Sequence, residues 1–76
     1  MIRLSMSTKH QIRTIVDALH VSTSDDSIRA NMRMRTAPKH GMRALSQSHI
    51  EAIEVYAVKT HHQNIALYNR VQSGRI

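Results

Sequence analysis

The sequence predicts a single all-α domain in which two short helices pack on a long third helix at the C-terminal end. Apolar residues recur at helical spacing in three stretches, and none shows the two-residue alternation of a strand. The only aromatic residues among the 76 are two tyrosines, so the core must be aliphatic, which suits helices packed on helices. A chain of this length forms one domain, and its core only just offsets the entropy of folding.

The first helix is expected over residues 9–20. Thr8 and Gln11 match a capping box, in which a hydroxyl and an amide satisfy free backbone groups at a helix start. Four apolar residues then share one helical face, namely Ile12, Ile15, Val16 and Leu19. Residues 1–7 are expected to precede this helix as a disordered arm or a short strand.

The second helix is expected to run from Asp25 to about Thr36. Asp25 and Asp26 would lie in its first turn, where the helix dipole favours negative charge. Ile28 and Met32 are four residues apart and therefore share a face. The segment 37–41 contains the only proline and one of the two glycines, so we interpret it as a turn.

The third helix is expected over residues 46–73, because no helix-breaking residue follows until Gly74. Ser46 can cap its start, and Glu51 and Glu54 are expected to be favourable charges near that start. At 1.5 Å per residue this helix is roughly 37 Å long. Its expected apolar face contains Ile50, Ile53, Ala57, Val58, Ile65, Leu67, Tyr68 and Val71.

The apolar residues in the distal half of this helix predict that the chain associates with a second copy of itself. The chain has no cysteine, so no disulfide or thiolate-bound metal can add to its small core. We expect a homodimer whose interface is formed by Ile65, Leu67, Tyr68 and Val71. The polar residues His61 and Asn64 on the same face have three interpretations. They are hydrogen-bonded at the margin of a core, or Asn64 fixes the register of the dimer, or both recognise a partner through polar groups in an apolar groove.

The charge pattern points to a polyanionic partner. Eleven lysines and arginines against five acids give a net charge of +6, which favours nucleic acid, an acidic protein or an anionic membrane surface. Between residues 27 and 50 there is no acid. The candidate DNA-binding residues in this window are Arg29, Asn31, Arg33, Arg35, Lys39 and Arg43. The alternative is a solvated basic surface that keeps the protein soluble.

Residues 13–34 resemble the helix-turn-helix of small DNA-binding regulators of phages and mobile elements. The resemblance consists of Ala18 in the first helix, the Leu19-His20-Val21-Ser22 turn, and the apolar Ile28 in the second helix. In this motif the second helix reads base edges in the major groove, and the small Ala18 would allow the two helices to approach closely. The resemblance implies a dimeric regulator that binds double-stranded DNA.

A second function class remains open. The chain could be a non-enzymatic protein-binding module, such as an inhibitor or adaptor that docks a basic or apolar helix face on a host protein. RNA is less favoured, because RNA recognition usually relies on exposed aromatic residues.

Other functions find no support in the sequence. No catalytic constellation or glycine-rich phosphate loop is present, so we expect no enzymatic activity and no cofactor. Although the chain has six histidines, those at 49, 61 and 62 lack the four-residue spacing that would hold one metal ion on a helix. No apolar run is long enough to span a bilayer, so a cytoplasmic protein is expected.

Overall fold

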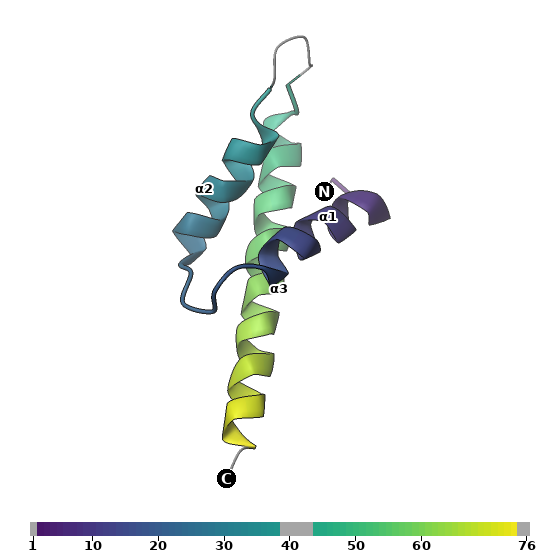
Figure 1. The fold of residues 1–76 in the computed structure, drawn as a ribbon. Coiled ribbons are helices and arrows are strands. Elements are labelled where there is room, and N and C mark those ends of the chain that lie inside the picture. The colour runs from purple at the N-terminus through teal and green to yellow at the C-terminus, as the bar shows by residue number, and fades with distance from the viewer. Residues whose placement is uncertain (1, 39–43, 75–76) are drawn as a thin grey trace.

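The computed structural model describes residues 2–38 and 44–74, which contain three helices and no strand. Helix α1 spans Met6–Asp17, α2 spans Asp25–Thr36 and α3 spans Gln47–Ser73. The two short helices each pack against α3 and make little contact with each other (Figure 1). The predicted all-α architecture, with two short helices on a long third helix, is confirmed.

Helix α1 begins and ends three residues earlier than the sequence predicted. Its N-cap is Ser5, whose hydroxyl accepts a hydrogen bond from the backbone N–H of Thr8, so Thr8 lies inside the first turn. This start allows Leu4 to enter the core, where it is buried. Much of the expected arm is therefore helix or core. The helix ends at Asp17, where hydrogen bonds to the third preceding residue replace those to the fourth. The Ala18 N–H donates to the Ile15 carbonyl and the Leu19 N–H donates to the Val16 carbonyl.

Helix α2 has the predicted boundaries, with Ser24 as its N-cap and both aspartates in its first turn. Helix α3 also begins as predicted, because the Ser46 hydroxyl accepts a hydrogen bond from the backbone N–H of His49. It continues for 27 residues to Ser73. At the ideal rise of 1.5 Å per residue, α3 is about 40 Å long. It is the longest helix, and both short helices pack on it.

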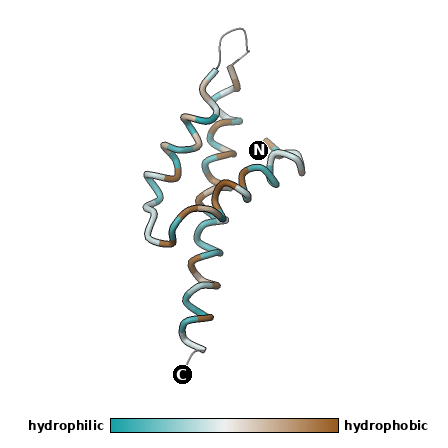
Figure 2. Tube along the Cα trace, in the orientation of Figure 1, coloured by the Kyte–Doolittle hydropathy of each residue, from teal (hydrophilic) through white to brown (hydrophobic). Residues whose placement is uncertain are grey.

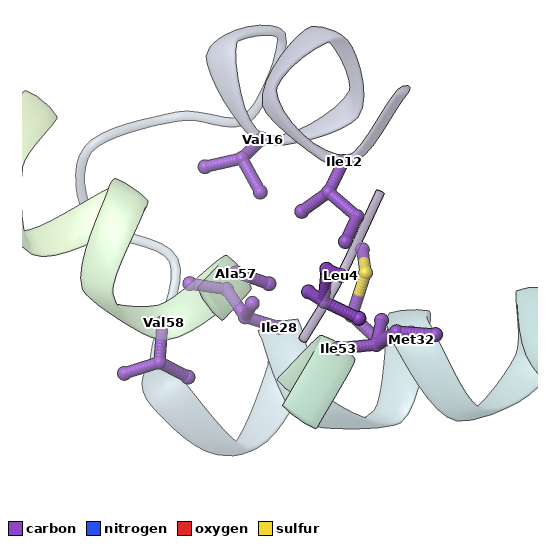
Figure 3. Packing of buried hydrophobic residues seen from close by; sticks show 8 residues of the cluster. All are labelled: Leu4, Ile12, Val16, Ile28, Met32, Ile53, Ala57 and Val58. Carbon is purple, nitrogen blue, oxygen red and sulfur yellow. The ribbon is translucent and has the colours of Figure 1, made fainter. Parts of the chain in front are cut away.

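The core lies where α1 and α2 meet the first half of α3 (Figure 3). The apolar faces predicted for the two short helices point into it, and eight apolar side chains are buried there: Leu4, Ile12, Val16, Ile28, Met32, Ile53, Ala57 and Val58. Coloured by hydropathy, the short helices show apolar stripes separated by polar residues (Figure 2). Burial of these stripes is what stabilises helices of only 12 residues.

Ala18 does not have the position expected from the helix-turn-helix resemblance. It is the C-cap of α1 and is exposed, so its small side chain does not bring α1 and α2 together. Instead, each short helix is held by α3. The consequence is that α2 packs mainly on α3 and has little contact with α1.

Candidate nucleic-acid interface

Helix α2 is exposed over most of its circumference. Ile28 and Met32 are its only fully buried residues, with 0% and 1% of their surface exposed. The basic residues predicted from the sequence, Arg29, Arg33 and Arg35, are all exposed, whereas Asn31 is half-buried. Lys39 and Arg43, the other two predicted DNA contacts, lie outside the described residues.

The basic residues of α2 occupy two flanks and not a single face. Arg29 and Arg33 are one turn apart on one side of the buried stripe, whereas Asn31 and Arg35 are one turn apart on the other side. At 100° per residue, Arg33 and Arg35 are roughly 160° apart around the helix. Met34, which is 78% exposed, lies between the two flanks. A ligand that contacts both flanks must therefore lie across the outward ridge of α2.

The flank formed by Asn31 and Arg35 is ordered by its own hydrogen bond. The Arg35 Nε donates to the side-chain oxygen of Asn31 over 2.6 Å. This bond uses one of the five guanidinium N–H groups, and the terminal nitrogens remain as donors. The Asn31 amide nitrogen also remains as a donor.

The other flank contains an ion pair to a buried acid. The Arg33 Nε lies 2.8 Å from the Glu54 carboxylate, and the two side chains are 67% and 7% exposed. The expectation that Glu54 is a charge at the start of α3 is wrong, because Glu54 is too far from that end and faces α2. Its neighbour Glu51 is exposed but also lies outside the first turn. Arg33 is therefore a structural partner as well as a surface cation.

This pair leads to a testable difference between two neighbouring arginines. Arg33→Ala should lower the free energy of unfolding by about 1–2 kcal/mol, because it leaves a buried carboxylate without its partner; the mostly exposed guanidinium keeps the loss below that of a fully buried pair. Arg29→Ala should change it by less than about 0.5 kcal/mol. Urea unfolding measures both. Adding Glu54→Gln to Arg33→Ala should recover part of the loss, and equal effects at Arg29 and Arg33 would contradict the assignment.

Two side chains of α3 contact the segment between the short helices and the start of α2, and thereby position α2. The Nε2 of His61 is 3.0 Å from the Thr23 carbonyl oxygen; a carbonyl only accepts, so this nitrogen carries the hydrogen. The Nε2 of His62 lies 2.8 Å from the carboxylate of Asp25 in the first turn of α2. His61 is buried, and its Nδ1 has no partner. Sequence reasoning placed His61 on the apolar face but could not identify the turn as its partner.

Asn64 forms a hydrogen bond within its own chain, which is the first of its predicted roles. Its amide nitrogen donates to the Asp17 carboxylate at the end of α1 over 2.7 Å. It is thus hydrogen-bonded within its own chain at the margin of the core. This contact also marks the point beyond which the short helices no longer cover α3.

The predicted dimer residues lie on the uncovered part of α3 (Figure 1). Leu67, Tyr68 and Val71 are 59%, 46% and 52% exposed, and Ile65 is half-buried. An ideal helix completes five turns in 18 residues, so Tyr68 and Val71 have the same orientation as Ile50 and Ile53. The face that is buried in the first half of α3 therefore continues, exposed, into its second half.

Within residues 2–38 and 44–74, no group of three His, Asp or Glu side chains is placed to hold a metal ion. None of the three helices is long and apolar enough to cross a membrane. Comparison with protein-family models, curated proteins and solved structures finds no match to this chain.

Proposed function

We propose that the protein is a small regulator that binds double-stranded DNA through the outward surface of α2 and acts as a homodimer formed by the distal half of α3. The observation that carries the proposal is the exposure of α2. This helix is anchored by two buried side chains, and it presents three arginines to solvent. An unobstructed helix of this kind has the dimensions that the major groove admits.

The charges along α2 favour one end for contact with DNA. Asp25 and Asp26 occupy its first turn, and the three arginines follow between residues 29 and 35. Phosphates repel the first turn and attract the rest of the helix. Arginine and asparagine side chains can form paired hydrogen bonds with guanine and adenine, so Arg29, Asn31 and Arg35 are the candidates for base or phosphate contacts.

The proposed dimer follows from the continuity of the α3 face. In the first half of α3 this apolar face forms the core with α1 and α2. In the distal half the face is exposed, and the same face of a second copy would bury it. Helices α1 and α2 cover the first half of α3, so two copies can pair only through the distal halves of their α3 helices. In an antiparallel pair, the two distal halves contact each other along their full length.

The antiparallel arrangement sets the distance between the two DNA-binding helices. The pairs Arg33–Glu54 and Asp25–His62 show that α2 runs antiparallel to α3 and is centred near Ala57. Ala57 precedes Tyr68 by eleven residues, which is roughly 17 Å of helix. If the two-fold axis passes near Tyr68, the two α2 helices are roughly 34 Å apart along α3, which is about one turn of B-DNA.

A salt titration with matched charge variants tests the DNA contact. Binding of a labelled duplex should weaken steeply with salt, because neutralised phosphates release counterions. Arg29→Gln and Arg35→Gln should each reduce the slope of log K against log salt by about one. Arg70→Gln removes the same charge from the distal half of α3, on the side away from its apolar face, and should leave the slope unchanged. Equal slopes for all four proteins would exclude α2 as the contact.

The alternative function is a protein-binding module, and one observation favours it. Met34 is exposed on the outward ridge of α2, next to the small Ala30 and between the arginines. An apolar ridge with basic flanks also fits an acidic protein surface with an apolar centre. If the protein binds no duplex at low salt, the protein-binding function is favoured over DNA binding.

A further inference from the structure

A second group of cations converges on another side of α3, away from α2. Lys9 and Arg13 are one turn apart on α1 and both face Tyr56 of α3. The Lys9 ammonium lies 5.8 Å from the centre of the Tyr56 ring. The Arg13 Nη2 donates to the Tyr56 hydroxyl oxygen over 3.5 Å. Two positive charges are thus held on one aromatic side chain.

We propose that Lys9, Arg13 and Tyr56 form a phosphate-binding site on the surface between α1 and α3. This site is separate from the arginines of α2 and does not depend on them. It lies outside residues 27–50, where the charge pattern predicted the basic surface.

The charges at this site are available to a ligand. The ion pairs in the described part of the chain involve Arg33 and His62, and neither Lys9 nor Arg13 takes part in one. The nearest acid along α1 is Asp17, one turn beyond Arg13, and its carboxylate accepts from Asn64. Arg33 on α2 differs, because its charge is largely matched by Glu54.

The donors that remain match a phosphate group. Arginine has five N–H groups, and the single bond from Arg13 to Tyr56 leaves four. Lys9 adds an ammonium with three donors. Charge-assisted hydrogen bonds from arginine and lysine to phosphate oxygens are among the strongest in proteins.

Tyr56 fixes the position of both cations before a ligand arrives. It is half-buried and packs against the core, so its ring provides a rigid support for two otherwise flexible side chains. Holding them in place reduces the entropy lost on binding. The hydrogen bond from Arg13 also lowers the pKa of Tyr56, because the guanidinium stabilises the phenolate.

That lowered pKa supplies a direct probe of the site. Tyr68→Phe leaves Tyr56 as the only tyrosine, and the absorbance of its phenolate gives its pKa in chloride, in tripolyphosphate at equal ionic strength, and with a DNA duplex. A bound phosphate adds negative charge beside the hydroxyl and competes for Arg13, so both effects should raise the pKa of Tyr56. In chloride alone, the pKa of Tyr56 should stay at the lowered value that Arg13 sets. Arg13→Gln should raise the pKa without any anion and abolish the response to phosphate.

The two phosphate sources give different results. A rise with both tripolyphosphate and duplex identifies the nucleic-acid backbone as a ligand, and Lys9→Gln and Arg13→Gln should then each flatten the salt slope of duplex binding by about one. A rise with tripolyphosphate alone supports a site for free phosphates. If neither raises the pKa, the site is overturned even when the duplex binds through α2. If tripolyphosphate raises it but no duplex binds, the site stands and the DNA-binding function fails.

Discussion

Replacing Leu67 and Val71 together by aspartate is expected to convert the protein into monomers and to reduce duplex binding by at least tenfold. Both side chains are more than half exposed on the uncovered part of α3, where the proposed partner would bury them. Four carboxylates at a two-fold interface would repel one another and lose their hydration. A monomer has a single α2, so it should lose the gain in affinity expected from joining two copies of the proposed DNA-binding helix.

A matched control separates assembly from charge. Ala66→Asp with Ser73→Asp adds the same two charges to exposed positions on the opposite side of the same helix. This control should remain dimeric and lose only the affinity that two added negative charges remove. Sedimentation at several protein concentrations measures the oligomeric state of each variant, and far-UV circular dichroism verifies that the total helical content persists. A monomeric unmodified protein would refute the dimer and leave this face for a different protein.

Ile28→Ala is expected to have the largest effect on stability. Ile28 is fully buried, and with Met32 it anchors α2 to α3. Removing its side chain leaves a cavity and should lower the free energy of unfolding by about 2–5 kcal/mol. A domain of this size has roughly 4–11 kcal/mol in total, so this loss is a large fraction of its stability and should move the urea midpoint well below that of the unmodified protein.

Met34→Ala is the control for that substitution, because it truncates an exposed apolar side chain six residues from Ile28 on the same helix. Its effect should stay within about 0.5 kcal/mol. Urea unfolding at one fixed protein concentration compares the two variants, since the proposed dimer would make stability depend on concentration. Equal losses would show that α2 is not anchored as described.

The fold could be predicted because its determinants are local. The boundaries of α2 are set by Ser24 and the two aspartates that follow it, which favour a helix start, and by Ala37-Pro38 at the other end. The start of α1 was predicted too late because Ser5 and Thr8 can both serve as caps. The choice between them depends on Leu4 packing into a core formed by distant residues, which no local pattern contains.

The candidate sites depend on contacts between residues far apart in the sequence. Glu54 and Glu51 are alike to a local analysis, and only the approach of Arg33 distinguishes them. The helical spacing of Lys9 and Arg13 is visible in the sequence, but Tyr56, on which they converge, is 43 residues from Arg13. The split of the α2 arginines into two flanks, by contrast, follows from helical periodicity once the buried stripe is known.

The most direct test of the proposed function is the number of chains bound to one duplex. Sedimentation of a labelled duplex about 25 base pairs long, mixed with the unmodified protein at low and high salt, gives that number. We predict two chains per duplex at low salt and free duplex at high salt, because binding depends on released counterions. A duplex that sediments alone at low salt, or a complex that persists unchanged at high salt, would contradict DNA binding by the basic surface of α2.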